Sequence, residues 1–335
     1  MTGRERIEAR IQGRPVDSLP LMPITMMFAA DSIGVPYREY ATDHRALAAA
    51  QLETAAKFDF DYVSVISDPA REASDLGAKI QWFDNQPPAI VESEALLSDK
   101  SSLARLRLPD MGGGRMLDRI EGVRLLARQT GASRIVEGWV EGPCAMAADL
   151  RGLNTLMLDL YDDEGFIIDL FEFAMAMEIE FARAQARAGA TLIGIGDAAA
   201  SLIGPRFYER FAQPYEQKMI RAIRGMGVPV RLHICGNTRK ILAGMGKTGA
   251  DIIDLDFLAP LGEGRAAMGE SQILLGNMDP VRALRDGTPE SVFQRLEECY
   301  TEAGPRYIAG AGCEVPRGTP HENVMAMTRF ARGRN

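Results

Sequence analysis

The sequence lacks long apolar runs and blocks of basic residues. None of its segments contains a run of roughly 18 uncharged apolar residues, which a membrane-spanning helix needs. Lys and Arg do not cluster, and the net charge is -8, which argues against nucleic acid as a partner because phosphate binding needs a basic surface. We therefore expect a protein without membrane or nucleic-acid partners, and the charged N-terminus favours a cytoplasmic location.

Cysteine and histidine are also scarce, with four Cys and three His in 335 residues. Four cysteines are too few for a disulfide framework, so in a reducing compartment they are ligands, nucleophiles or core residues. Cys299 follows a helical apolar pattern and is interpreted as core packing, whereas Cys144 is left open between the core and a pocket. Cys235 and Cys313 remain as the candidates for chemistry.

Short apolar runs alternate regularly with helical patterns, for example over 44–58, 116–130, 166–188 and 205–224. Strands are predicted over 21–26, 61–66, 135–140, 191–195, 228–234, 251–255, 272–275 and 307–309. The glycine- and proline-containing region 74–108 predicts an excursion with a small hairpin. Eight strands alternating with helices predict an α/β fold, a (β/α)8 TIM barrel in a single domain over residues 1–335, with excursions at the N-terminus and between the second and third strands.

Polar residues gather where these strands end, and in such barrels the carboxyl ends of the strands form the active site. The residues are Asp68, Glu141, Asp197, His233, Cys235, Asp256, Asn277 and Cys313. We interpret Asp68, Glu141 and Asp197 as candidate catalytic residues, and Asp256 and Asn277 as candidate cofactor-binding residues. For each of the acids, a helix cap or a salt bridge at the rim is an equally good interpretation.

His233 and Cys235 lie two residues apart at the end of a predicted strand, so their side chains point into one space. Cys313 follows another strand of the same barrel and can meet them there. Taken alone, His-x-Cys is more typical of core residues, but the distant third ligand favours a metal site. Zinc binds imidazole and thiolate readily, and one His with two Cys leaves a fourth position open, as in catalytic sites.

The ligand set also favours one kind of chemistry. Two thiolates cancel the charge of the ion, so a substrate thiolate in the open position would stay electron-rich and attack carbon, which favours alkyl transfer to sulfur over hydrolysis. Glu141, Asp197 or Asp256 could fill the fourth position or orient His233 through its second ring nitrogen.

Motifs spread over about residues 14–331 carry a resemblance to a known family. They are Gly142-Pro143, Ala148-Asp-Leu-Arg-Gly152, Gly196-Asp197, Phe207-Tyr208, Pro214-Tyr215, His233-Ile-Cys-Gly-Asn-Thr238, Gly276-Asn-Met-Asp-Pro280, Gly312-Cys-Glu-Val-Pro316, Thr319-Pro320 and Glu322-Asn-Val324. On these motifs the chain resembles the uroporphyrinogen decarboxylase (URO-D) superfamily, and within it the zinc-dependent corrinoid methyltransferases similar to methylcobalamin:coenzyme M methyltransferase. The resemblance implies methyl transfer between a corrinoid, either methylcobalamin or a small corrinoid-binding protein, and a thiol or other methylated small molecule.

The chain departs from the decarboxylases at several positions. It has no arginine over 22–30, where the decarboxylases carry an arginine-containing segment, and Cys313 replaces a histidine of theirs. Asp149 and Ala198 stand where they have Tyr and Ser, and Asp68 matches. We therefore expect a transferase, with a decarboxylase, a non-catalytic tetrapyrrole-binding protein or a zinc hydrolase as alternatives. The direction of transfer and a homodimeric state stay open.

Overall fold

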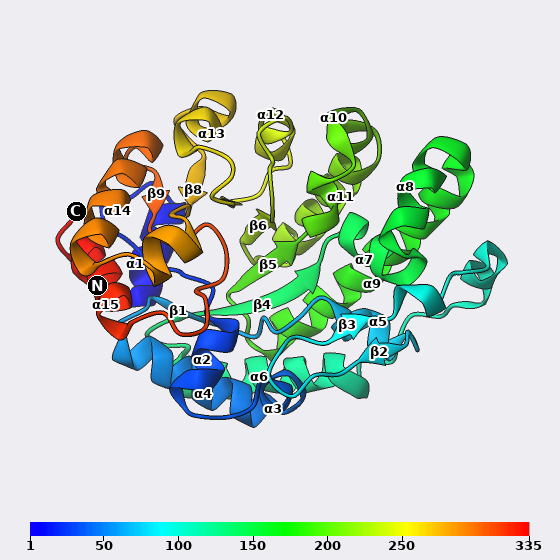
Figure 1. Ribbon diagram of the computed structural model, residues 1–335, viewed down its shortest axis with the longest axis horizontal. Coiled ribbons are helices and arrows are strands. Elements are labelled where there is room, and N and C mark those ends of the chain that lie inside the picture. The colour runs from blue at the N-terminus through cyan, green and yellow to red at the C-terminus, as the bar shows by residue number, and fades with distance from the viewer. Residues whose placement is uncertain (335) are drawn as a thin grey trace.

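Seven parallel strands curl around the centre of the molecule (Figure 1). The structure is a computed structural model and describes residues 1–334. Along the sheet the strands follow chain order, β1 (Tyr62–Ser64), β4 (Ile135–Glu141), β5 (Leu192–Gly196), β6 (Val230–Ile234), β7 (Ile252–Leu255), β8 (Ile273–Leu275) and β9 (Tyr307–Ile308). All neighbouring strands are parallel, so their carboxyl ends open on one rim, as the sequence predicts for a TIM barrel.

The segment around Leu21 closes the ring between β9 and β1. Leu21 forms a parallel bridge with Ala309, and its carbonyl accepts a hydrogen bond from the backbone N–H of Asp61 (3.2 Å). The strand predicted over 21–26 is therefore wrong in extent, because the described chain pairs there at a single bridge. Pro23 has no N–H to donate and interrupts the ladder.

Helices alternate with the strands and pack around the barrel (Figure 1). They are α1 (Gly3–Ile11), α2 (Met26–Ser32), α3 (Tyr37–Thr42), α4 (His44–Lys57), α5 (Ala70–Asp75), α6 (Gly114–Thr130), α7 (Pro143–Arg151), α8 (Leu153–Asp162), α9 (Glu164–Ala188), α10 (Gly204–Phe207), α11 (Gln213–Arg224), α12 (Leu242–Gly246), α13 (Leu261–Met268), α14 (Pro289–Ala303) and α15 (His321–Arg332). Shorter helical turns are η1 (Glu92–Glu94), η2 (Lys100–Arg105), η3 (Ala198–Ser201), η4 (Tyr208–Ala212) and η5 (Pro280–Arg285). Across residues 1–334, no helix is both long enough and apolar enough to cross a membrane.

The helix predicted over 205–224 is interrupted. The short α10 is followed by η4, which is a π-helical turn, and then by α11. Pro214 lies in the first turn of α11 and cannot donate a hydrogen bond to the carbonyl four residues earlier, because it has no N–H. The interruption thus has a local cause that the pattern of apolar residues does not reveal.

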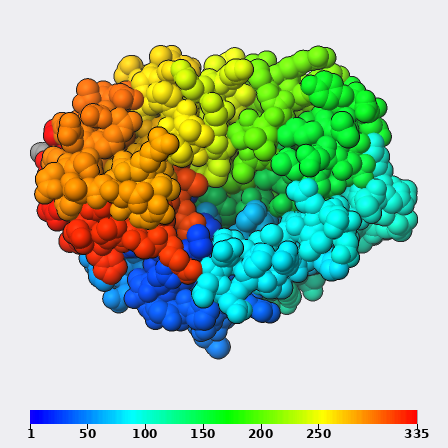
Figure 2. All heavy atoms as spheres, viewed as in Figure 1, coloured from blue at the N-terminus to red at the C-terminus, as the bar shows by residue number. Residues whose placement is uncertain are grey.

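The excursion between the second and third predicted strands contains the expected hairpin, with β2 (Ile80–Gln81) antiparallel to β3 (Ala89–Ile90). It lies beside the mouth of the barrel. Figure 2 shows a hollow near the centre of this face, bordered by N-terminal segments in blue, the excursion in cyan and the C-terminal loop in red. The hollow is where the strand ends converge.

Three layers of side chains fill the barrel interior. The bottom layer belongs to an apolar cluster of Ile7, Met22, Tyr62, Ile135, Leu192, Ile252, Ile273, Leu275 and Ile308. In the middle layer the fully buried Arg231 lies between Glu137 (3.2 Å) and Asp254 (2.6 Å). In the top layer Trp139 packs with Ile24 and Ile66. The middle layer places a charged group directly beneath the mouth of the barrel.

Candidate metal centre and pocket

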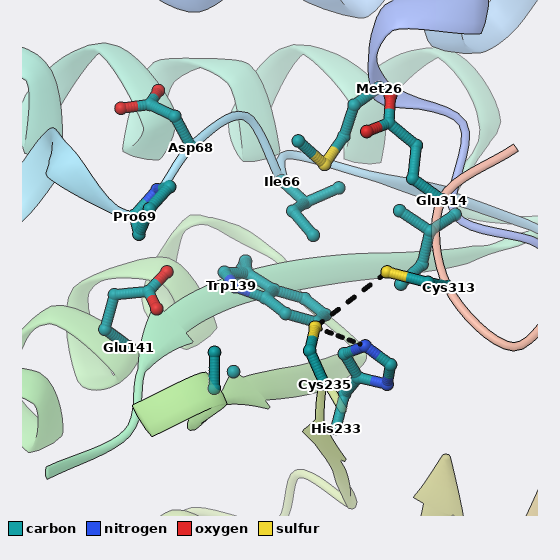
Figure 3. Close-up of a pocket in the computed structure, with 13 residues that line it drawn as sticks. Met26, Ile66, Asp68, Pro69, Trp139, Glu141, His233, Cys235, Cys313 and Glu314 are labelled. Carbon is teal, nitrogen blue, oxygen red and sulfur yellow. Dashed lines mark hydrogen bonds between the residues drawn. The ribbon is translucent and has the colours of Figure 1, made fainter. Parts of the chain in front are cut away.

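His233 ends the inner face of β6, Cys235 follows that strand directly, and Cys313 lies in the loop after β9 (Figure 3). His233 Nε2 is 3.0 Å from Cys235 Sγ, which is 3.8 Å from Cys313 Sγ. The three ligand atoms lie within 4.8 Å of one another. The structure thus brings together the three residues that the sequence pairs only by strand position.

The donor set fits a zinc ion. Two sulfurs bound to one tetrahedral zinc at about 2.3 Å are about 3.8 Å apart, and the separation of Cys235 Sγ and Cys313 Sγ is 3.8 Å. The imidazole supplies a third donor beside them. One side of the cluster faces a cavity, which leaves room for a fourth ligand from outside the chain.

Asp254 orients the imidazole of His233. Its Oδ2 lies 3.0 Å from His233 Nδ1, so Nδ1 carries the hydrogen and Nε2 points toward the two sulfurs. The strand register pairs His233 with Asp254 across β6 and β7. Sequence reasoning missed this residue and offered Glu141, Asp197 or Asp256 instead. The available signal was a carboxylate inside the apolar run Ile252 to Leu255, which rarely occurs without a partner.

The electrostatics of the cluster favour loss of a thiol proton. A hydrogen bond from Cys235 and the nearby His233 hold the pKa of Cys313 well below its ordinary value. The same hydrogen bond, together with burial, raises the pKa of Cys235. Burial tends to lower the pKa of His233, but the charges of Cys235 and Asp254 outweigh it and raise that pKa well above its ordinary value. The cluster therefore stabilises a thiolate, which is the form that binds metals.

A cavity of about 180 Å³ opens above the three ligands. Its walls are formed by Ile24, Met26, Ile66, Asp68, Pro69, Trp139, Glu141, Gly196, Ala198 and Glu314. The indole of Trp139 reaches into it because β5 has glycines opposite: a Cβ at Gly196 would lie 2.9 Å from the ring, and one at Gly194 would overlap it. The cavity is thus mainly apolar, with carboxyl groups at its edges.

Two of the predicted catalytic acids line this cavity. Asp68 is bound by both terminal nitrogens of Arg115, at 2.5 and 3.0 Å, so its charge is paired. Glu141 is almost fully buried, and burial, followed by the proximity of Glu72, raises its pKa well above the ordinary value. Glu141 thus faces the cavity as a carboxyl group that loses its proton less readily than an ordinary glutamate. The catalytic roles of both acids stay predictions.

The third predicted acid, Asp197, lies away from the cavity. Its side chain is fully buried and accepts hydrogen bonds from the backbone N–H groups of Ala145 (2.6 Å) and Cys144 (3.4 Å), in the first turn of α7. Burial raises its pKa to about 7, and it also contacts the buried Glu216. This position matches the helix-cap interpretation, and Cys144 is likewise buried outside the cavity.

The two candidate cofactor-binding residues shape the loops behind the metal ligands. Asp256 accepts hydrogen bonds from the backbone N–H groups of Gly236 (2.8 Å) and Leu258 (2.9 Å). Asn277 donates to the carbonyls of Asp256 (3.1 Å) and Ala259. Neither side chain lines the cavity, and their cofactor-binding role stays a prediction.

Glu314 is a cavity residue that sequence reasoning did not single out, although it follows Cys313 directly. Its Oε1 accepts a hydrogen bond from the backbone N–H of Met27 (2.6 Å), and burial raises its pKa to about 7. Figure 3 shows it beside Met26, on the opposite side of the pocket from Glu141. The pocket is therefore flanked by carboxyl groups on both sides.

Comparisons with known proteins agree with this geometry. The model of the family described as uroporphyrinogen decarboxylase (URO-D) matches residues 2–334. The chain is 30% identical over 340 residues to the methylcobamide:CoM methyltransferase MtbA of Methanosarcina mazei, covering 99% of this chain and 98% of that protein. It is 26% identical over 253 residues to a uroporphyrinogen decarboxylase of Streptomyces coelicolor, covering 74% and 69% of the two chains.

Among solved structures, a methyltransferase from Methanosarcina mazei has the same fold. It superposes with a TM-score of 0.90 at 23% sequence identity, covering 99% of this chain and 98% of the other. The match spans the whole barrel, including the segments that carry His233, Cys235 and Cys313. The chain therefore belongs to the uroporphyrinogen decarboxylase (URO-D) family.

Proposed function

We propose that this chain is a zinc-dependent methyltransferase that moves a methyl group between a corrinoid and a thiol. The observation that carries the proposal is the meeting of His233, Cys235 and Cys313 at the base of a cavity in the barrel mouth. The 30% identity to a methylcobamide:CoM methyltransferase over nearly the full length of both chains supports it. The decarboxylase relative has lower identity and shorter coverage, which makes decarboxylation the weaker alternative.

The residues around the cavity would have separate roles in the reaction. His233, Cys235 and Cys313 hold the metal, and Asp254 keeps Nε2 of the imidazole free to bind it. A zinc ion in this site would lower the pKa of a substrate thiol, so that its sulfur attacks as a thiolate. Trp139 and the aliphatic walls exclude water, which strengthens electrostatic interactions inside the cavity.

When the thiol is methylated, one bond forms for each bond that breaks. The thiol releases its proton, a sulfur–carbon bond forms, and the cobalt–carbon bond breaks with its electron pair staying on cobalt. In the opposite direction a methylated donor gives its methyl group to the reduced corrinoid. A methylcobalamin molecule or a small corrinoid-binding protein would sit over the hollow that Figure 2 shows.

Two further features belong to the proposal. All four cysteines are unpaired, which suits a reducing compartment such as the cytoplasm, where thiol ligands persist. One apolar core runs from Leu19 to Ala331, which supports a single domain over residues 1–335. A homodimer stays a hypothesis.

The first experiment is a measurement of zinc content, followed by the loss of methylcobalamin absorbance in the presence of thiols. We expect one zinc per chain in the wild type, loss of zinc in Cys235→Ala and Cys313→Ala, and thiol-dependent demethylation that follows the zinc content. Cys299→Ala is the matched control, because Cys299 is a buried core cysteine outside the ligand set. A chain without zinc under metal-replete conditions would contradict the proposal. Corrinoid binding that survives Cys313→Ala, with no turnover in the wild type, would favour the non-catalytic binding protein.

A further inference from the structure

A second cavity adjoins the metal pocket. It has a volume of about 240 Å³ and shares the side chains of Pro69, Glu141 and Ala198 with the first cavity. In Figure 3 Glu141 and Pro69 lie on the side of the pocket away from Cys313. A substrate whose sulfur is held at the metal centre could therefore extend past Glu141 into the second cavity.

This second cavity is acidic. Three carboxyl side chains line it, those of Glu92, Glu141 and Asp149, and none of its lining residues in the described chain is basic. Glu92 is exposed at the surface, whereas Glu141 is nearly buried. Oδ2 of Asp149 is buried and has no hydrogen-bond partner among residues 1–334. An unpartnered buried carboxylate oxygen in a cavity wall points to a donor that comes from outside the chain.

The nearby arginines bind other carboxylates. Arg115 is held by Asp68 at 2.5 and 3.0 Å, and Nη2 of the fully buried Arg71 contacts Glu72 at 2.5 Å. Nε and Nη1 of Arg71 make no hydrogen bond among residues 1–334. Neither arginine lines the cavity. An anionic substrate group would therefore meet no basic side chain in the cavity wall, whereas an ammonium group would meet three carboxyl groups that can accept its hydrogen bonds.

We propose that the second cavity selects a substrate that carries an ammonium group and disfavours one that ends in a sulfonate or a carboxylate. The inference rests on the proposed methyl transfer at the neighbouring metal centre, and it names the substrate class of that reaction. The ammonium group would donate to Oδ2 of Asp149 and face Glu141, while Glu92 at the mouth attracts cations.

The pKa shifts of Asp149 and Glu141 agree with this assignment. Burial, followed by the charge of Glu72, raises the pKa values of both Asp149 and Glu141 well above their ordinary values. Both groups therefore tend to hold protons when no cation is near. A bound ammonium group supplies positive charge and hydrogen-bond donors in place of those protons.

The test is a thiol series in which only the terminal group differs, with methylcobalamin as the methyl donor and zinc-loaded enzyme. The first set is aminoethanethiol, mercaptoethanol and mercaptoethanesulfonate, and chains lengthened by one or two carbons extend the reach. We expect kcat/KM to follow the order ammonium, hydroxyl, sulfonate, with about tenfold or more between the first two, as for a hydrogen bond to a charged group. Sulfonate as the best substrate, or equal values for ammonium and hydroxyl at every chain length, would overturn the inference.

The two proposals fail in different ways. If mercaptoethanesulfonate is the best of the thiols, methyl transfer stands and the ammonium assignment falls. If no thiol of any charge demethylates methylcobalamin although zinc is bound, the proposed function itself falls.

Substitution of Asp149 locates the effect. Asp149→Asn keeps the size of the side chain but removes its charge, and we expect the ammonium-to-hydroxyl ratio of kcat/KM to drop toward one. Asp162→Asn, on the exposed end of α8, removes the same charge and should leave the ratio at its wild-type value. Glu141→Gln is the second variant if Asp149→Asn does not fold, and it should lower the same ratio. A wild-type ratio in folded Asp149→Asn would refute the assignment.

Discussion

The pairing of Asp254 with His233 makes a quantitative prediction about metal affinity. Oδ2 of Asp254 contacts His233 Nδ1 (3.0 Å) and also accepts from Arg231 Nη2 (2.6 Å) and Nε (3.1 Å). The carboxylate is 1% exposed and Arg231 is fully buried. One buried carboxylate therefore contacts both the imidazole of His233 and the guanidinium of Arg231 in the middle layer of the barrel.

Asp254→Asn would keep an oxygen at this position and remove its charge. Loss of a group that orients a metal ligand weakens metal binding by about 10- to 100-fold, or about 1.4 to 2.7 kcal/mol. We expect the lower end of this range, because the amide oxygen can still accept from Nδ1. Asp254→Ala removes the side-chain acceptor as well and should approach the upper end, because only the backbone carbonyl of residue 254 is left within reach of Nδ1 (3.3 Å). It should also destabilise the fold by about 3 kcal/mol or somewhat less, since Arg231 keeps only Glu137.

The assay is competition for zinc against a chromogenic chelator, combined with urea denaturation of each variant. Asp251→Asn is the control, because Asp251 precedes the same strand and binds the backbone N–H of Val230 (2.8 Å), away from the ligands. It should change stability without changing zinc affinity. Wild-type zinc affinity in Asp254→Asn, or an equal loss in Asp251→Asn, would refute the role assigned to Asp254.

Two further predictions concern the fold around the site. Burial raises the pKa of Asp197 to about 7 and that of Glu216 well above its ordinary value. The contribution of this pair to the free energy of unfolding is therefore fully present below the unfolded-state pKa of about 4. It is lost as pH rises through about 7. Glu216→Gln should therefore become more stable relative to the wild type as pH rises from 6 to 8, by up to about 1.4 kcal/mol per pH unit, as measured by urea titrations at each pH. The exposed Glu209→Gln is the control and should show no such trend. A parallel trend in both variants would contradict the argument. Gly194→Ala places a methyl group against Trp139 and should destabilise the fold by about 1 to 3 kcal/mol. Urea denaturation measures it, and recovery in the double variant with Trp139→Leu would confirm the clash, whereas an unchanged midpoint in Gly194→Ala alone would disprove it.

The sequence by itself determined the strand pattern and the three residues of the candidate metal site. Short apolar runs ending in glycine or polar residues placed seven of the eight predicted strands within about two residues of their bounds, because a buried strand leaves a local signature. His233 and Cys235 share one strand end, so alternation of side chains alone put them on one face. Pairing them with Cys313 needed only the rule that parallel strands end on one rim.

Only the tertiary structure decided where the candidate acids lie relative to the ligands. Asp197, Asp254 and Asp256 all lie at or near strand ends, yet Asp197 caps α7, Asp256 holds a loop, and Asp254 alone contacts the imidazole. The difference depends on the register of β6 against β7, which aligns His233 with Asp254. Likewise the acidic second cavity exists because α7 and β4 bring Asp149 beside Glu141. Register and helix packing are sums of many contacts between distant segments, so no local pattern encodes them.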